Sequence, residues 1–560
     1  MQLPNLTLAS LREQTLGADA WIQTPFGERM LVYADYTASG RCLGFVEDYC
    51  CQLATLHANS HTEDSLTGHA MTHLLHEAEA AIKSALNAGP SGKVICCGSG
   101  STGAIHKLQE ILGVAIPPAT LQFVKQSLGD GALSEIRQNQ PVVFVGPYEH
   151  HSNEVTWREG LATVVEVELD SNGQIDLHLL EQLLQDPQFE GRKLIGSFSA
   201  GSNVTGLKAP VHEIARLLHR HGAIALFDYA ASAPYVPIDM NPEGDPEGKL
   251  DAVFFSPHKF IGGPGSAGVL VFDEALYPTH LPPSVGGGGT VDYVGPHGHD
   301  FTADIEAREK AGTPGVFQVV RAALALEIKR ELGIDIIQNR EDELLKPALS
   351  RWSSHDRIEV LGPLDPSKRI GIVSFNIADG DGGYLHPKLV TTLLNDLFGI
   401  QSRAGCSCAG PYGHRLLGID QVTSERYRNV IRSGKHGVKP GWCRVGFHYT
   451  MDDAEADYIV RAVELIADHG NCFVPLYDFN VDSGCWTHKE ISTKLPDFSL
   501  SDAVRSEKAV LSARPESERR VFYQKTLDDV RALAEALPHK TCKAKLEGEL
   551  GELQFFALAE

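Results

Sequence analysis

The chain has 560 residues, of which 42% are hydrophobic and 22% are charged, a composition that is ordinary for a soluble globular protein. No apolar run approaches the roughly 20 residues that a membrane-spanning helix requires, so we expect no membrane span. The formal net charge of −23 repels phosphate backbones, and we expect no nucleic-acid partner. The first residues, MQLPNLTLASLREQTLGADAW, lack the basic-then-hydrophobic order of a secretory signal, which predicts a cytoplasmic protein.

Strand and helix signals alternate from about residue 75 to residue 228. Helices are predicted where apolar residues recur at helical spacing, at residues 72–89, 104–112 and 211–222. Strands are predicted at the short apolar runs 93–97, 141–146, 193–199 and 223–228. This βαβ order predicts a largely parallel sheet with helices on both faces.

The second half of the chain indicates a change of domain. The segment SVGGGGTVDYVGPHGHD (284–300) interrupts the alternation and is predicted to be a mobile loop with a functional role. A helix is predicted at 316–333, a new α/β set begins near 370–377, and a polar, irregular region from 476 is followed by a helix at 518–537. We therefore expect an N-terminal segment (1–30) that packs with the small domain, a large domain (31–320), a small domain (321–475) and a C-terminal extension (476–560).

Residues 253–270, VFFSPHKFIGGPGSAGVL, place a lysine where an apolar strand ends. Lysine is costly to bury without a partner or a chemical role, so Lys259 is a candidate functional residue. Other predicted strands also end in polar residues: the turn CCGSGSTG suits a phosphate, and the carboxylate of Asp228 needs a cation. Further candidates at strand ends are His150, His151, Asn203, Ser256 and His258. Because ligands bind at the carboxyl ends of parallel strands, one shared site is predicted, with a plain glycine turn and solvated histidines as the alternative.

One kind of ligand would use all of these groups, namely an aromatic aldehyde that carries a phosphate and a protonatable ring nitrogen. Pyridoxal 5'-phosphate has these features. In this interpretation Lys259 forms a Schiff base with the aldehyde, Asp228 holds the proton of the ring nitrogen, and an imidazole stacks on the ring.

The sequence resembles the fold-type I pyridoxal-phosphate enzymes of aminotransferase class V, and within them the cysteine desulfurases of the group that includes selenocysteine lyases. The resemblance covers roughly residues 30–470 and implies an α/β fold: a large domain with a mainly parallel seven-stranded sheet flanked by helices, and a smaller α/β C-terminal domain. The matching stretches, in family order, are YADYTASGR (33–41), NSHTEDS (59–65), GSGSTGAIHKL, EHHSNEVTW, SNVTG, FDYAASA, FSPHKFIGGPG, AGTP, SRAGCSCAG (402–410) and CRVGF (443–447).

The resemblance implies cofactor-binding roles for several of these residues. His150 is similar to the histidine that stacks on the cofactor ring, and Asn203 is similar to the asparagine near the ring hydroxyl. Thr313 resembles a threonine that reaches the cofactor phosphate of the neighbouring subunit, which implies a homodimer with shared active sites. The implied phosphate ligands within the chain are Ser101, Thr102, Ser256 and His258.

The resemblance also implies a substrate site and a nucleophile. Arg444 resembles the arginine that holds the substrate carboxylate, and Arg403 resembles a second arginine of the same pocket. Cys408 aligns with the cysteine that attacks the substrate sulfur and carries it as a persulfide. Cys406 as the nucleophile, a structural or redox-linked pair, and a metal-binding pair stay open as alternatives.

The implied function is that of a cysteine desulfurase-like transferase or lyase, with Lys259, Cys408 and His150 as catalytic residues. It would remove sulfur or selenium from L-cysteine or a related small amino acid to give alanine and an enzyme persulfide, with a sulfur-acceptor protein as a possible partner. Two departures bear on the reaction: Ala231 stands where these desulfurases commonly have glutamine, and VGFHYTMDD (445–453) differs from the usual pattern. An aminotransferase, a β-lyase or an amino-acid epimerase of the same family is therefore an alternative, and a non-catalytic scaffold is a further one.

Overall fold

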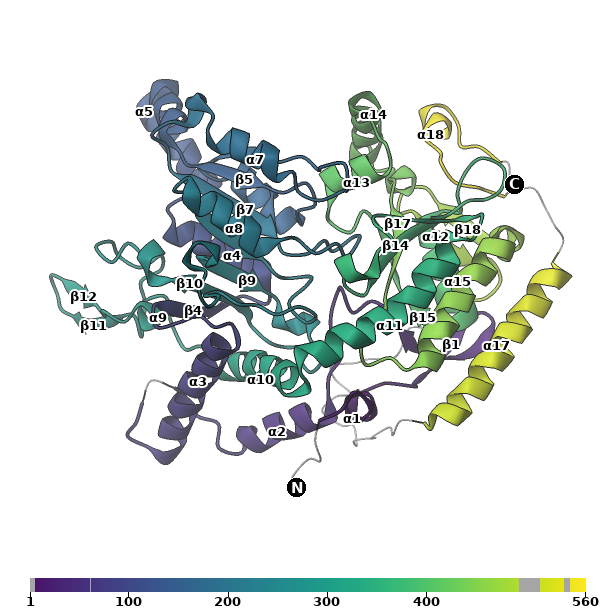
Figure 1. Cartoon of the computed structure of the whole chain (residues 1–560), viewed down its shortest axis with the longest axis horizontal. Helices are drawn as coiled ribbons and strands as arrows, with labels where there is room; N and C mark the ends of the chain where they lie inside the picture. Colours follow the sequence, from purple (N-terminus) through teal and green to yellow (C-terminus); the bar gives the residue numbers. More distant parts are fainter. Residues whose placement is uncertain (1–5, 61, 493–513, 538–543, 560) are drawn as a thin grey trace. The chain divides into compact units, whose positions relative to one another are not determined.

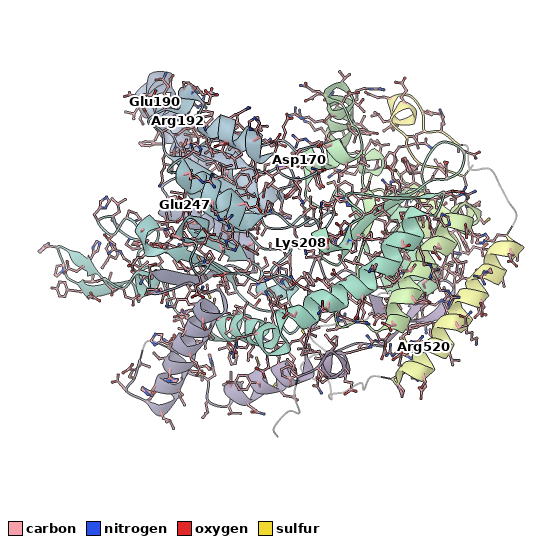
Figure 2. All side chains as sticks on the ribbon, viewed as in Figure 1. Asp170, Glu190, Arg192, Lys208, Glu247 and Arg520 are labelled. Carbon is pink, nitrogen blue, oxygen red and sulfur yellow. The ribbon has the colours of Figure 1, made fainter. Side chains whose placement is uncertain are left out.

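The computed structural model describes residues 6–60, 62–492, 514–537 and 544–559 (Figure 1). The chain divides into two compact units, unit 1 built mainly from Thr37–Gln338 and unit 2 from Thr7–Tyr36 and Asn339–Glu560. The domain boundary expected at residue 320 lies within helix α10 (Val316–Leu332) of unit 1. Charged side chains such as those of Glu247 and Arg520 are exposed to solvent (Figure 2).

A seven-stranded sheet forms the centre of unit 1. Its strands are β4 (Gly92–Cys97), β5 (Val142–Val145), β6 (Thr163–Glu166), β7 (Leu194–Ser199), β8 (Ile224–Asp228), β9 (Ala252–Phe255) and β10 (Gly268–Asp273). They lie in the order β4-β10-β9-β8-β7-β5-β6. The run from β9 to β6 is parallel, whereas β10 is antiparallel to both β9 and β4. The prediction of a mainly parallel seven-stranded sheet is confirmed.

Helices cover both faces of this sheet because successive strand residues point to opposite sides. Ile195 of β7 joins the core cluster that α4 (Ser101–Ile111) covers with Ile105 and Leu108. The next residue, Gly196, faces α8 (Val211–Arg220), and a Cβ there would lie 2.5 Å from the Leu218 side chain. The other helices of unit 1 are α2 (Gly44–Ala54), α3 (Leu66–Ala85), α5 (Pro118–Asn139), α6 (Val155–Arg158), α7 (Leu177–Leu184), α9 (Ile305–Arg308) and α10.

The glycine-rich segment 284–300 is not a plain loop, so that prediction was wrong. It contains the strand β11 (Val291–Val294), which pairs antiparallel with β12 (His299–Phe301) across a register shift. Most side chains of this hairpin are exposed, including those of Tyr293 and Val294. The sequence pattern therefore carries no burial signal that would distinguish a hairpin from a loop.

Unit 2 contains a four-stranded sheet in the order β13-β14-β17-β16. Its strands in the chain are β1 (Trp21–Thr24), β2 (Gly27–Met30), β3 (Val32–Tyr33), β13 (Ile358–Val360), β14 (Ile372–Ile377), β15 (Ile400–Gln401), β16 (Arg403–Gly405), β17 (Trp442–Gly446), β18 (Tyr477–Asn480) and β19 (Cys485–His488). Its helices are α1 (Leu8–Gln14), α12 (Pro387–Phe398), α13 (Gly410–Leu416), α14 (Gln421–Arg432), α15 (Asp453–Phe473), α17 (Glu516–Ala536) and α18 (Glu549–Glu552), and α11 (Ile334–Ser353) begins in unit 1.

The C-terminal extension is more regular than its polar sequence indicated. The hairpin of β18 and β19 lies in the region predicted to be irregular, and it pairs Tyr477 with His488. The helix predicted at 518–537 is confirmed as α17. Among the described residues, no helix combines the length and the apolarity needed to cross a membrane.

Candidate active site

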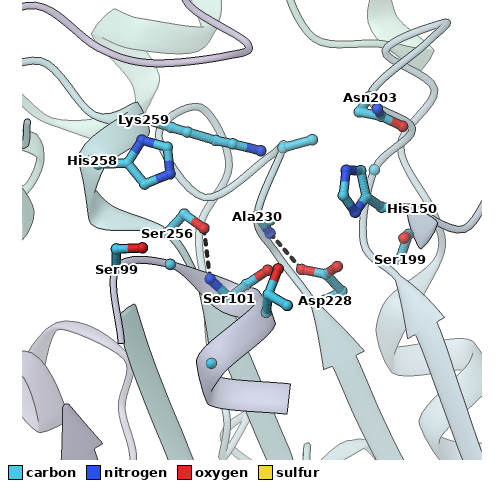
Figure 3. Close-up of a pocket in the computed structure, with 15 residues that line it drawn as sticks. Ser99, Ser101, His150, Ser199, Asn203, Asp228, Ala230, Ser256, His258 and Lys259 are labelled. Carbon is cyan, nitrogen blue, oxygen red and sulfur yellow. Dashed lines mark hydrogen bonds between the residues drawn. The ribbon is translucent and has the colours of Figure 1, made fainter. Parts of the chain in front are cut away.

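A cavity of about 260 Å³ opens where the strands of the unit 1 sheet end (Figure 3). It is lined by residues that follow β4, β5, β7, β8 and β9. Eight residues predicted from the sequence line it together: Ser101, Thr102, His150, Asn203, Asp228, Ser256, His258 and Lys259. His151 is not among the lining residues. The strand ends thus bring together groups that lie up to 158 positions apart in the chain, from Ser101 to Lys259.

Lys259 lies at the end of a short 3₁₀ turn, Pro257–Lys259, directly after β9. The following glycines are required by close backbone packing, since a Cβ at Gly263 would lie 1.9 Å from the Pro257 carbonyl oxygen. Gly40 packs against the same turn, where its amide donates to the His258 carbonyl at 2.8 Å. Two segments therefore fix the backbone that carries Lys259, and its side chain extends into the cavity (Figure 3).

The start of α4 forms a polar cradle on one side of the cavity. The Ser101 amide, at the first turn of this helix, donates to the Ser256 hydroxyl at 2.7 Å. A Cβ at Gly100 would lie 2.9 Å from Ser256 Oγ and 3.4 Å from His258 Nε2, so any side chain there would fill the cradle. Burial lowers the pKa of His258, and the nearby Lys259 lowers it further. Helix N-terminal amides with hydroxyls and an imidazole are a donor set that suits a phosphate.

Asp228 lies buried at the end of β8, with only 3% of its surface exposed. Its Oδ1 accepts a hydrogen bond from the Ala230 amide at 2.8 Å. Burial raises the pKa of Asp228 to about 6, while the Ala230 amide, Lys259 and Ser101 favour the ionised form. A buried carboxylate with a perturbed pKa that faces a ligand cavity is typical of a functional group that pairs with a cation.

His150 faces the cavity with a defined tautomer. The Ser152 amide donates to His150 Nδ1 at 3.1 Å, so the proton of the neutral ring is on Nε2. The Ser152 hydroxyl lies 2.7 Å from Thr102 Oγ1, which links the histidine to the start of α4. Beside it, Glu149 is buried and accepts hydrogen bonds from the Ser199 amide and hydroxyl at 2.8 and 2.6 Å. Burial raises the pKa of Glu149 to about 7.

Sequence reasoning missed Glu149 and Ser199. Glu149 holds the end of β7 against the turn that carries His150, and Ser199 lines the cavity. The signal for Ser199 was present, because it ends the apolar strand that precedes Asn203. Ala231, which stands at the usual glutamine position, lines the cavity with a methyl group that offers no hydrogen bond.

Arg403 and Arg444 lie side by side in unit 2, because they are register partners of the antiparallel strands β16 and β17. Asp35 bridges them: its Oδ2 is 3.0 Å from Arg403 Nε, and its Oδ1 is 3.0 Å from Arg444 Nη2. Arg444 has a side chain that is 4% exposed, whereas the side chain of Arg403 is 53% exposed. Asp35 was not predicted, although it lies within the matching stretch YADYTASGR.

Cys408 lies in the turn between β16 and α13, and it is exposed. Both Ser407 and Cys408 have left-handed backbone conformations, with φ of 50° and 57°, which are uncommon for residues other than glycine. Cys406 is half-buried. Burial lowers the pKa of Arg444, whereas the nearby carboxylate of Asp35 raises it. Over the described part of the chain, no group of three or more potential ligands is placed to hold a metal ion.

Thr313 is exposed and does not line the cavity of its own chain. It follows Glu309 and Lys310, which are anchored by Tyr277 at 2.7 Å and by Glu79 at 2.7 Å. The predicted contact of Thr313 with a neighbouring subunit stays a prediction.

The chain is similar to known proteins over most of its length. The profile of the family described as Aminotransferase class-V matches residues 32–459. A probable cysteine desulfurase of Halalkalibacterium halodurans is 33% identical over 307 residues, which are 54% of this chain and 69% of that protein. A probable cysteine desulfurase of Staphylococcus aureus strain N315 is 29% identical over 392 residues, 68% of this chain and 84% of that protein. The solved apo structure of a cysteine desulfurase from Thermococcus onnurineus NA1 has a TM-score of 0.61 at 23% identity, covers 78% of this chain and 95% of that chain, and supports the fold.

Proposed function

The chain belongs to the aminotransferase class-V family, and we propose that it is a pyridoxal-phosphate enzyme that removes sulfur or selenium from L-cysteine or a close relative. The products would be alanine and a persulfide on the enzyme. The observation that carries this proposal is the single cavity in which Lys259, Asp228, His150 and the polar start of α4 meet.

The residues of the cavity fit pyridoxal 5'-phosphate in their chemistry. Ser101, Thr102, Ser256 and His258 would hold the phosphate at the start of α4, and Asn203 would lie near the ring hydroxyl. Lys259 would hold the aldehyde through its amine. When bound, the cofactor supplies an aldehyde that captures amino groups and a protonated ring that withdraws electrons from the substrate Cα.

Asp228, Lys259 and His150 each have a definite protonation task in this proposal. Above its pKa of about 6, Asp228 is ionised and can keep a proton on a ring nitrogen. Lys259, once its amine is released, moves the proton at the substrate Cα. His150 presents its flat ring, with the proton on Nε2, to the same cavity.

Unit 2 would supply the substrate carboxylate site and the nucleophile. Arg444 and Arg403 bind the α-carboxylate, a task that suits the planar guanidinium. The Cys408 thiolate attacks the substrate sulfur, forming an S–S bond as the Cβ–S bond breaks. The electron pair of the broken bond stays with the carbon skeleton, which takes up protons and leaves as alanine, so the step requires no external oxidant or reductant. The exposure of Cys408 favours it over the half-buried Cys406.

The assembly and the location of the enzyme are parts of the same proposal. A homodimer would place Thr313 at the cofactor phosphate of the neighbouring subunit, and the exposure of Thr313 in the single chain is consistent with this role. We also propose a cytoplasmic location and a sulfur-acceptor protein that takes the persulfide sulfur. Sedimentation or light scattering of the purified chain measures directly whether it is a homodimer.

An amino-acid panel tests the function. The purified holoenzyme is mixed with cysteine, selenocysteine, serine, cysteine sulfinate and an amino-donor/keto-acid pair, while sulfide, alanine and keto acid are measured. We expect alanine from cysteine, its loss in Cys408→Ser, and an unchanged cofactor absorbance in that variant. Cys406→Ser is the matched control and should keep most of the activity. A new keto acid together with a new amino acid from the amino-donor/keto-acid pair would indicate an aminotransferase. Pyruvate and sulfide from cysteine without alanine, with activity retained in Cys408→Ser, would indicate a β-lyase.

A further inference from the structure

The bridge from Asp35 to the two arginines is built into the backbone of unit 2. The Gly446 amide at the end of β17 donates to the Ala34 carbonyl at 2.7 Å, directly before Asp35. On the other side, β3 pairs in parallel with β15, which pairs Tyr33 with Gln401. Main-chain hydrogen bonds therefore hold the backbone that leads to Asp35 beside the arginine strands, and its carboxylate contacts both arginines.

The charges of this cluster do not cancel. Two guanidinium groups on adjacent strands repel each other, and one carboxylate neutralises one of the two charges. The net charge of Asp35, Arg403 and Arg444 is thus +1. Arg444 and Asp35 are largely shielded from solvent, with 4% and 13% of their side chains exposed, so their charges are screened less than that of Arg403, whose side chain is 53% exposed.

A net charge of +1 matches a ligand with one uncompensated carboxylate. We propose that Asp35 is a specificity-determining residue that limits the arginine pair to amino acids with an uncharged side chain and disfavours those with a second carboxylate, such as aspartate. The inference rests on the proposed function, in which Arg403 and Arg444 hold the substrate α-carboxylate. It goes further by naming the substrate class and the residue that selects it.

The size of the effect follows from Coulomb's law. A second ligand carboxylate about 8 Å from Asp35, at an effective dielectric constant of about 40, is disfavoured about fivefold by the charge of Asp35. Asparagine keeps the shape of the side chain and its ability to accept hydrogen bonds, but it removes the charge. A residue that merely held the arginines in place would affect ligands with one and with two carboxylates equally.

The test is to measure by calorimetry the binding of L-alanine and of L-aspartate to the holoenzyme. This measurement does not depend on turnover. We expect the wild type to bind L-aspartate at least tenfold more weakly than L-alanine. In Asp35→Asn the ratio of the two Kd values should fall by about fivefold, while Asp35→Glu, which keeps the charge, should leave it close to that of the wild type. Asp478→Asn is the matched control, because Asp478 is exposed on β18 of the same unit.

Two results would overturn the inference. One is equal binding of L-alanine and L-aspartate by the wild type, which can be measured even if the variants fail to fold. The other is a ratio that stays within twofold of wild type in Asp35→Asn. Failure of the proposed function is a separate outcome, since it appears as a wild type that releases no alanine from cysteine, whatever the ratio of the two Kd values.

Discussion

Replacing Asp228 with asparagine should stabilise the cofactor-free protein and inactivate the enzyme. Burial raises the pKa of Asp228 from 3.8 to about 6, so the folded state binds this proton more tightly than the unfolded state. The resulting contribution to stability is complete below pH 3.8 and is lost as the pH rises through 6. A shift of about two pH units corresponds to about 3 kcal/mol, and the group is only 3% exposed, so solvent screens little of it.

The assay is urea unfolding of the cofactor-free wild type and of Asp228→Asn between pH 4.5 and pH 8. The free energy of unfolding of the variant, relative to wild type, should rise by about 2 kcal/mol across this range, because asparagine does not ionise and about 1 kcal/mol of the total is already lost by pH 4.5. The same variant should lose at least about a hundredfold in turnover, since it cannot keep the ring nitrogen protonated. Stability and activity would thus change in opposite directions at one position.

Asp251 offers a control of the opposite sign. It is also buried, but it precedes β9 and pairs with His219 at 2.8 Å and with the Ala225 amide at 2.9 Å. Burial alone would raise its pKa, yet these partners lower it overall. Asp251→Asn should therefore destabilise the protein at pH 8. If Asp228→Asn also destabilised the cofactor-free protein at pH 8, or if its advantage did not grow with pH, the electrostatic reasoning for Asp228 would be wrong.

Two further substitutions test parts of the fold. Gly263→Ala should cost about 2–3 kcal/mol of stability and lower cofactor occupancy, because the added Cβ would meet the Pro257 carbonyl oxygen. Gly288→Ala is the control, since open space surrounds that position, and it should change little. Thermal unfolding measures the stability, and absorbance titration measures the cofactor occupancy. Burial lowers the pKa of His386 to about 4, so the folded state favours the neutral ring, and stability should fall by up to about 3 kcal/mol as the pH drops from 6.5 to 4. His386→Asn should reduce this loss of stability at acid pH, as measured by urea unfolding at each pH. An unchanged dependence of the free energy of unfolding on pH would contradict the role of His386.

Strand ends were predictable because their signal is local. Lys259 and Asp228 each follow an apolar run, and the topology of a parallel sheet then brings such ends to one edge. The direction of β10 was not predictable in this way, since GVLVFD is apolar and buried whichever way it runs. The hairpin of β11 and β12 was not predicted for the opposite reason. Its side chains are mostly exposed, so its sequence does not alternate between buried and exposed residues.

Asp35 illustrates a different limit of prediction from the sequence. Its partners lie 368 and 409 positions away in the sequence, so no local pattern relates them. The two arginines could be named from their motifs, but the sequence does not state that one carboxylate would serve both. Such a bridge depends on the register of β16 and β17, which sets Arg403 opposite Arg444.

The two clusters of charge solve one problem in two ways. A chain with a net charge of −23 repels anions at long range, yet the proposed ligands carry a phosphate and a carboxylate. In unit 1 the anion would meet backbone amides and hydroxyls at the start of α4, which add no formal charge and leave Asp228 free to serve a cation. In unit 2 the anion would meet full guanidinium charges, and these must be moderated, because two unmoderated cations would bind any dianion more tightly than a monoanion. The carboxylate of Asp35 offsets one of the two guanidinium charges. It weakens the binding of every anion at this site, and it would also let the site distinguish a monoanion from a dianion.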